Sequence, residues 1–125
     1  MASPKVISIV DDDASVRTAI SSLVRSIGCD SLVFSSAAAF IDSGCESRSD
    51  CLITDIHMPG MSGLDLHDKL HAAGSTVPVI FITAFPEFKT REHALQRGAI
   101  CFLVKPFNAD VLIDCVERAL QRGLS

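Results

Sequence analysis

The sequence predicts a single α/β domain in which parallel strands are covered by helices on both faces. Short apolar runs alternate with helix-like segments at the spacing of repeated strand–helix units. Acidic residues directly follow two of these runs, at positions 11–13 and at Asp55. The chain has 125 residues, of which 48% are hydrophobic, and this is enough for one domain with a substantial core. We therefore expect residues 1–125 to form one doubly wound domain.

Two strand–helix units are predicted in the first fifty residues. The run at 5–10 is apolar and β-branched, as in a buried strand, and the next helix shows apolar residues at three- and four-residue intervals until Gly28. The second unit is shorter, and Ser35 or Ser36 is expected to cap its helix. The predicted ranges are 5–10 and 31–34 for the strands, 14–27 and 37–42 for the helices, and 44–50 for a polar loop.

Three further strands are predicted in the rest of the chain. A loop rich in Pro and Gly, at 57–63, precedes a helix that carries Leu66 and Leu70. The segment 86–97 is polar with poor apolar periodicity, so we expect a weakly held helix there. Asn108 is placed to cap the last helix. The strands are predicted at 51–54, 78–82 and 100–104, and the last helix turns Val111, Leu112, Cys115, Val116 and Ala119 inward.

The acidic residues at strand ends indicate a metal site. The carboxyl ends of parallel strands meet at one crevice, so Asp11, Asp12 and Asp55 are expected to converge. Converging carboxylates raise one another's pKa unless a cation is present. No His or Cys stands at ligand spacing nearby, which favours an ion that prefers oxygen, Mg²⁺ first. The alternative interpretation, that the aspartates only cap the helix starting near Ala14, is the preferred one for Asp13.

Two further polar residues are expected at the same crevice. Thr83 follows the fourth predicted strand, and Lys105 follows the fifth. A lysine ammonium suits a phosphate or a carboxylate, and a threonine hydroxyl can donate to a phosphoryl oxygen. Taken singly, each has an ordinary interpretation, as a β-branched strand residue and as a solvated lysine.

Charge and hydropathy exclude two classes of function. The net charge of −4 and the acidic isoelectric point argue against a broad nucleic-acid surface, which needs clustered Lys and Arg. No apolar stretch approaches the roughly 20 residues of a membrane span, and the N-terminus lacks the apolar core of a signal peptide. We therefore expect a cytoplasmic domain that binds neither nucleic acid nor membrane.

The cysteines are expected to be reduced. They number five and contain no Cys-x-x-Cys pair, and several fall within apolar patterns. A disulfide or a metal role is the less favoured interpretation. The five are Cys29, Cys45, Cys51, Cys101 and Cys115.

Four ordered motifs resemble the receiver domain of two-component response regulators. They read IVDDD at 9–13, TDIHMPGMSG at 54–63, FITA at 81–84 and FLVKPF at 102–107. The resemblance covers essentially the whole chain, and the third and last motifs are most similar to regulators of the FixJ and NarL type. It implies a CheY-like, flavodoxin-like (βα)5 fold with strand order 2-1-3-4-5.

The resemblance also implies roles for the crevice residues. Asp55 would be the phosphorylation site. Mg²⁺, with Mn²⁺ as a substitute, would be held by Asp12, Asp55 and the backbone carbonyl of His57, with Asp11 acting mainly through a metal-bound water. Lys105 would pair with Asp55 and then with the phosphoryl group. The implied donor is a phosphohistidine on a sensor histidine kinase or a phosphotransfer protein.

A conformational switch is implied as well. Phosphorylation would draw the Thr83 hydroxyl toward the phosphoryl group and let Phe102 turn inward, changing a surface made of the fourth helix, fifth strand and fifth helix. A downstream effector or a dimer partner would bind there. Pro106 would follow a cis peptide bond, and Phe85 beside the attacking water is expected to slow hydrolysis. The domain would promote only its own phosphorylation and dephosphorylation, and in that sense is not an enzyme.

The same residues also bear on other functions. A haloacid-dehalogenase-type phosphatase would need an aspartate where this chain has His57, and a nucleotide-binding enzyme would need a glycine-rich loop at 11–13. A phosphate-independent interaction module on the same fold is the alternative from another class. It predicts loss of one of four residues, all of which are present: Asp12, Asp55, Thr83 and Lys105. Two interpretations stay open, a regulator of one domain and a receiver followed by an effector domain beyond Ser125.

Overall fold

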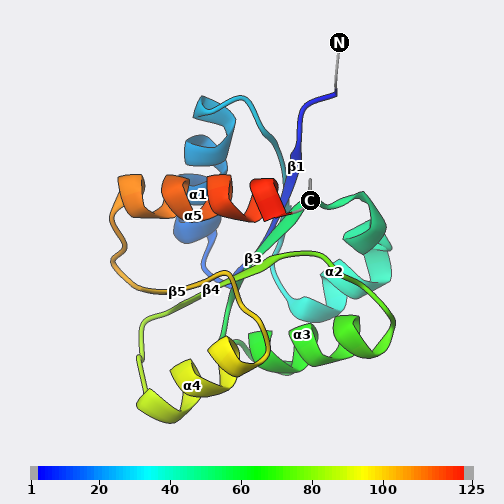
Figure 1. Ribbon diagram of the computed structural model, residues 1–125, viewed down its shortest axis with the longest axis vertical. Coiled ribbons are helices and arrows are strands. Elements are labelled where there is room, and N and C mark those ends of the chain that lie inside the picture. The colour runs from blue at the N-terminus through cyan, green and yellow to red at the C-terminus, as the bar shows by residue number, and fades with distance from the viewer. Residues whose placement is uncertain (1–2, 123–125) are drawn as a thin grey trace.

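A single sheet of five parallel strands runs through the centre of the molecule (Figure 1). The computed structural model describes residues 3–122. Neighbouring strands follow the order β2-β1-β3-β4-β5, which confirms the predicted order. The strands are β1 (Val6–Val10), β2 (Asp30–Phe34), β3 (Cys51–Asp55), β4 (Val79–Thr83) and β5 (Cys101–Val104).

Helices cover both faces of the sheet. In Figure 1, α1 and α5 lie on one side of it, and α2, α3 and α4 lie on the other. The segment 44–50, predicted as a loop, contains a 3₁₀ helix, η1 (Cys45–Arg48), so that prediction was wrong in part. So short a helix has no apolar repeat by which a sequence could reveal it. The α-helices are α1 (Ala14–Ser26), α2 (Ala37–Ser43), α3 (Gly63–Ala72), α4 (Phe88–Gln96) and α5 (Ala109–Arg122).

Each face of the sheet has its own apolar cluster. Ile9 and Ile53 pack toward α1 and α5, together with Leu112 of α5. Leu52 and Phe81 belong to the cluster on the opposite face. Every residue of β3 and β4 is buried, as expected for central strands of a parallel sheet covered on both sides.

Side-chain caps fix where four of the helices begin, α3 among them, where the Ser62 hydroxyl accepts from Asp65 N–H at 3.1 Å. The Asp13 carboxylate accepts hydrogen bonds from the backbone N–H groups of Ser15 and Val16, which confirms Asp13 as the N-cap of α1. The Ser36 hydroxyl accepts from Ala39 N–H at the start of α2. The Asn108 side chain accepts from the first turn of α5, at 2.8 and 3.4 Å. Each cap satisfies N–H groups that have no partner within the helix.

Helix α4 is attached to the core by little apolar surface. Ala94 is its one buried residue, and its N-cap, Glu87, makes no side-chain capping bond. Phe88 and Leu95 of the same helix are exposed. This agrees with the weak periodicity of 86–97, because burial of an apolar face supplies most of the stability of a helix in a protein. No helix in the described part of the chain has the length and apolar character to cross a membrane.

Two cysteines contradict the prediction of reduced thiols. Cys101 of β5 and Cys115 of α5 form a disulfide, with their Cα atoms 6.2 Å apart. The other three cysteines are free, and Cys29 and Cys51 among them are buried. The pair joins a strand to a helix 14 residues later, so the proximity arises only when α5 packs on the sheet.

Candidate functional site

Three carboxylates meet at the carboxyl ends of β1 and β3. These strands pair in parallel with Val10 opposite Thr54, which places the next residues, Asp11 and Asp55, side by side. Oxygen atoms of Asp11, Asp12 and Asp55 all lie within 4.8 Å of one another. Asp11 is fully buried, Asp55 is 5% exposed and Asp12 is open to solvent. The predicted convergence of these three residues is thereby confirmed.

The Asp11 carboxylate is fixed by its neighbours. Its Oδ1 atom accepts a hydrogen bond of 2.8 Å from Asp13 N–H, and its Oδ2 atom lies 2.9 Å from Lys105 Nζ. Arg17 of α1 donates a hydrogen bond of 2.7 Å to the backbone carbonyl of Asp11. Burial raises the pKa of Asp11, although the bonds from Asp13 and Lys105 oppose that rise. Arg17 was not among the predicted site residues, and its only signal in the sequence is its place near the start of the helix after the aspartates.

Lys105 directly follows β5, and its side chain reaches the carboxylates at the ends of β1 and β3. Its Nζ atom lies 3.1 Å from Asp55 Oδ2, and the following peptide bond, to Pro106, is cis as the resemblance implied. Burial of the ammonium disfavours its charge, but hydrogen bonds to Asp11 and Asp55 outweigh burial and raise the pKa of Lys105. Lys105 is therefore a charged donor held against the two buried carboxylates.

Thr83 and Phe102 lie on the strands next to the cluster. Thr83 ends β4, is fully buried, and accepts a hydrogen bond of 3.0 Å from Phe85 N–H with its hydroxyl oxygen. Its backbone carbonyl accepts from Lys105 N–H at 2.8 Å, so the ends of β4 and β5 are joined. Phe102 of β5 is half-buried and packs on the α3 and α4 side of the sheet.

His57 and Phe85 stand on the two loops beside Asp55. The His57 backbone N–H lies 3.3 Å from Asp55 Oδ1, within hydrogen-bond reach. The His57 side chain is exposed, and its ring meets that of Phe85 edge to face at 5.7 Å between centroids. Phe85 is itself 64% exposed. The two loops that flank Asp55 are thus in contact through these rings.

Gly63 lets the loop after β3 pack directly on Asp55. A Cβ atom at this position would overlap the carbonyl oxygen of Asp55 and would lie 3.0 Å from its carbonyl carbon. The N–H of Gly63 donates to Ile56 O at 3.0 Å, which holds the start of α3 against the end of β3. In the sequence this glycine was placed in a loop rich in Pro and Gly and in the second receiver-like motif, without a contact to Asp55. Its position as the first residue of α3, where glycine is a poor helix former, is the signal that could have found it.

The donor set fits a small divalent cation. Carboxylate oxygens are the ligands that Mg²⁺ prefers, and two of these three carboxylates are in low-dielectric surroundings where their repulsion is strong. Among the described residues, Lys105 is the one cation that forms an ion pair with this cluster. Three carboxylates against one ammonium leave an excess of negative charge, which a divalent cation would neutralise.

Comparison with known proteins gives consistent matches. The family described as "Response regulator receiver domain" matches residues 7–117. The chain is 45% identical over 116 residues to the response regulator protein TmoT of Ectopseudomonas mendocina, covering 93% of this chain and 53% of that protein. It is 37% identical to the transcriptional regulatory protein FixJ of Azorhizobium caulinodans, covering 92% of this chain and 54% of FixJ. The chain thus spans about half the length of the curated relatives it matches.

Solved structures agree with the sequence relatives. The structure of the response regulator StyR superposes with a TM-score of 0.90 at 37% identity, covering 98% of this chain and 62% of StyR. A crystal structure titled FixJ-N superposes with a TM-score of 0.85 at 32% identity, covering 96% of both chains. The similarity to FixJ that the motifs indicated is present in both comparisons.

Proposed function

This chain belongs to the response regulator receiver domain family, and from that membership we propose that Asp55 is its phosphoryl acceptor. The observation that carries the proposal is the surroundings of Asp55, a buried carboxylate beside two further carboxylates and in contact with Lys105. The proposed donor is a phosphohistidine of a sensor histidine kinase or a phosphotransfer protein. Residues 1–125 act as the receiver unit in this proposal.

The transfer is a displacement at phosphorus. A carboxylate oxygen of Asp55 forms a bond to the phosphorus atom while the bond from phosphorus to the donor nitrogen breaks, and the product is an acyl phosphate on Asp55. Lys105, which lies 3.1 Å from Asp55, stabilises the negative charge on the transferring oxygens. Water later hydrolyses the acyl phosphate at the same position. The domain thus promotes its own phosphorylation and dephosphorylation and turns over no other substrate.

Magnesium is the proposed cofactor, with Mn²⁺ as a substitute. Asp12, Asp55 and the backbone carbonyl of His57 would hold the ion, and when bound it would neutralise charge on the phosphoryl oxygens. One carboxylate oxygen of Asp11 accepts a hydrogen bond from Asp13 N–H, and the other forms an ion pair with Lys105. This supports an indirect part for Asp11, which orients Lys105 and the ligand sphere.

Thr83 and Phe102 are the proposed switch. The Thr83 hydroxyl hydrogen would turn to a phosphoryl oxygen once Asp55 is modified, and Phe102 would move from half-buried to buried. A charge added at Asp55 would thereby favour one of two existing arrangements of β4 and β5. The hydrogen bond from Lys105 N–H to the Thr83 carbonyl supports coupling between β4 and β5, because it joins the ends of these strands near Asp55.

The output surface is proposed to consist of α4, β5 and α5. Exposed apolar side chains gather on these elements and on the loop before α4, which favours binding of a downstream effector or a dimer partner. They are Phe85, Phe88, Leu95, Val104 and Val111. The domain is proposed to act in the cytoplasm without contacting nucleic acid or membrane itself.

Mass spectrometry of the intact protein tests the proposal. The chain is incubated with a small acyl-phosphate donor with and without Mg²⁺, beside an Asp55→Asn variant. We expect the mass of one phosphoryl group to be added only when both Mg²⁺ and Asp55 are present. Absence of that gain, together with absence of Mg²⁺ binding, would favour the phosphate-independent interaction module instead.

A further inference from the structure

The Cys101–Cys115 pair lies where the output elements join the sheet. Cys101 is the first residue of β5, the strand that also carries Phe102, and Cys115 lies in the middle of α5. The disulfide therefore links two elements of the proposed output surface covalently. Cys101 is 7% exposed and Cys115 is 1% exposed, so both sulfur atoms are largely shielded from solvent.

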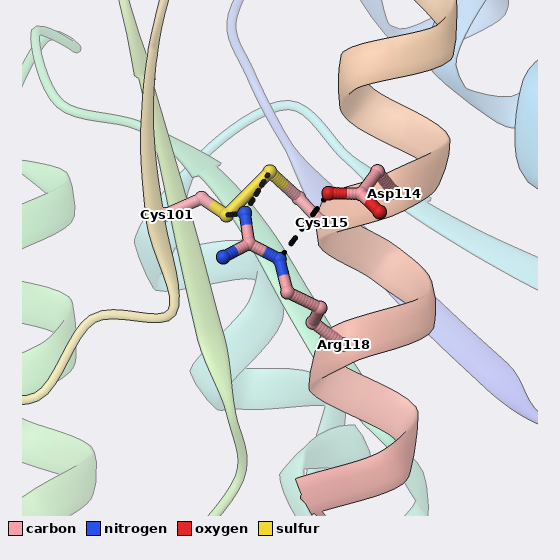
Figure 2. Close-up of a disulfide and its surroundings, with 4 residues drawn as sticks. All are labelled: Cys101, Asp114, Cys115 and Arg118. Atoms are coloured by element: carbon pink, nitrogen blue, oxygen red, sulfur yellow. Dashed lines mark hydrogen bonds and ion pairs between the residues drawn. A yellow bond between two sulfur atoms is a disulfide. The ribbon is translucent and has the colours of Figure 1, made fainter.

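A guanidinium group lies directly beside the sulfur atoms. Figure 2 shows Arg118, one turn after Cys115 on α5, with its side chain folded back over the disulfide. Its Nη2 atom lies 3.0 Å from Cys101 Sγ and 3.6 Å from Cys115 Sγ. The Nε atom pairs with Asp114 at 3.3 Å. A cation beside a thiol favours the thiolate, which is the form that reacts.

The surroundings also accommodate the reduced pair. Both cysteines belong to the apolar cluster between the sheet and α5, with Leu112 and Val116 among its members. A free cysteine behaves in such a cluster as a small hydrophobic residue, so packing does not depend on the bond. The Arg118 side chain is 58% exposed and its ion pair with Asp114 is at the surface, so it can move aside for a small reagent.

We propose that Cys101 and Cys115 are a reversible dithiol–disulfide redox site that takes a peroxide as oxidant. Cys101 is the attacking thiol and Arg118 is its positioning residue, because Cys101 is the more exposed residue and its sulfur is the closer one to the guanidinium. Under the cytoplasmic location proposed above, disulfides are typically transient and redox-sensing, which supports reversibility. The site itself uses none of the residues around Asp55.

The chemistry balances with a peroxide and a dithiol reductant. The Cys101 thiolate attacks one oxygen of hydrogen peroxide, the O–O bond breaks, and the released hydroxide takes a proton to become water. The Cys115 sulfur then attacks the sulfenic acid on Cys101, forming the S–S bond and releasing a second water. Two thiols are oxidised and one peroxide is reduced to two waters. A dithiol restores the thiols by exchange and becomes a disulfide itself.

Counting of alkylated thiols tests the site. The full chain is reduced, freed of reductant, treated with hydrogen peroxide, quenched, unfolded and alkylated, and the mass of the intact protein is then measured. We expect five alkylated cysteines before peroxide, three after it, and five again after a dithiol is added. A peptide digest of the oxidised wild type should contain the linked peptides of Cys101 and Cys115. Five alkylated thiols after peroxide, or linkage of a different pair, would overturn the proposal.

Variants separate this pair from the other cysteines. Cys101→Ser should keep four alkylated thiols after peroxide. Cys115→Ser should keep three and gain one oxygen atom, because Cys101 is oxidised to a sulfenic acid that no second thiol resolves. The matched control Cys45→Ser should fall from four alkylated thiols to two. Loss of two thiols in Cys101→Ser would contradict the assignment. The digest of the wild type keeps the test decisive if a serine variant fails to fold. Phosphorylation does not enter any of these readouts, so the result is independent of the proposed role of Asp55.

The pH dependence of the rate of peroxide oxidation tests the role of Arg118. Arg118→Gln should slow peroxide oxidation several-fold at neutral pH and shift the rate profile to higher pH, because the thiolate loses its neighbouring cation. Arg118→Lys should restore part of the rate, and Arg25→Gln, which removes the same charge from an exposed position on α1, should change neither rate nor profile. A profile in Arg118→Gln identical to that of the wild type would overturn the positioning role.

Discussion

Lys105 Nζ lies 3.1 Å from Asp55 Oδ2, although 50 residues separate the two along the chain. The same ammonium contacts Asp11, so one cation serves two buried carboxylates. Strand order brings this about, since β3, β4 and β5 are neighbours and their carboxyl ends share one edge.

Removing the Lys105 charge tests its part in phosphoryl transfer. Lys105→Met keeps an apolar stem of similar length, and we expect phosphorylation by a small acyl-phosphate donor to slow about 100-fold, as when one preorganised donor is lost. Rates are followed by intact mass. Lys69→Met, which removes the same charge from an exposed site on α3, serves as the control. Equal rates in the two variants would refute the role.

The adjacent Asp12 and Asp13 are predicted to have different tasks. Asp13→Ala removes the N-cap of α1 and should lower the free energy of unfolding by about 1 kcal/mol. Its Mg²⁺-dependent phosphorylation should survive. Asp12→Ala should show the opposite pattern, with phosphorylation lost and stability nearly unchanged, because Asp12 makes no capping bond. Urea unfolding and intact mass measure the two effects, and the idea fails if both variants lose phosphorylation equally.

Burial of Asp11 predicts a pH-dependent stability in the absence of metal. The pKa of Asp11 is raised by burial, so its protonated form favours the folded state, and that contribution is lost as pH rises through the folded pKa. Asp11→Asn, which stays neutral, should therefore be more stable than the wild type at neutral pH and no more stable at pH below 3.8. Urea unfolding with a chelator at several pH values measures this.

An exposed acidic residue provides the comparison for that experiment. Asp42→Asn lies at the surface of α2 and should not give the same pH-dependent gain. A metal-free Asp11→Asn protein that is less stable than the wild type at neutral pH would show that the bonds from Asp13 and Lys105 outweigh the cost of burial.

Gly63 is predicted to tolerate no side chain. Gly63→Ala would drive Cβ into the backbone of Asp55, so we expect destabilisation of about 1–3 kcal/mol together with slower phosphorylation. The control is Gly44→Ala, where a Cβ would meet nothing within 4 Å but φ is +69°. That variant should lose stability through backbone strain and keep its phosphorylation rate. Stabilisation by Gly63→Ala, as helix propensity alone would give, would contradict the structure.

Phe85 is predicted to prolong the phosphorylated state. Its ring stacks edge to face on His57 beside Asp55, so a smaller side chain should open a path for water. Phe85→Ala should accelerate dephosphorylation several-fold, measured as loss of phosphoryl mass after the donor is removed. The comparison is Phe88→Ala, because Phe88 on α4 is also an exposed phenylalanine. An unchanged rate in Phe85→Ala would dispose of the shielding role.

Local patterns were sufficient for the fold and for the placement of the site. Each apolar run became a strand, and the polar residues at the ends of four of these strands lie near one another because parallel strands share their carboxyl edge. They are Asp11, Asp55, Thr83 and Lys105. The caps at Asp13, Ser36 and Asn108 followed from side-chain chemistry alone. These features depend on near neighbours in the chain, which a sequence displays directly.

What the sequence did not reveal depends on packing between distant elements. The Cys101–Cys115 bond requires α5 to lie on β5, and the contact of Gly63 with Asp55 requires a particular path of the loop. Phe88 falls in a polar segment, so its exposure as part of an apolar patch was not apparent from periodicity. Arg17 contacts a backbone carbonyl, so its position near the start of the helix is the one mark it leaves in the sequence.

The order of the strands also determines when the site is completed during synthesis on the ribosome. Chains emerge from the N-terminus, so the three aspartates are made well before Lys105. A nascent chain that ends before β5 can bring the carboxylates together but has no lysine to pair with them. Pairing of β5 with β4 therefore completes the sheet and brings the Lys105 ammonium to the carboxylates in one step.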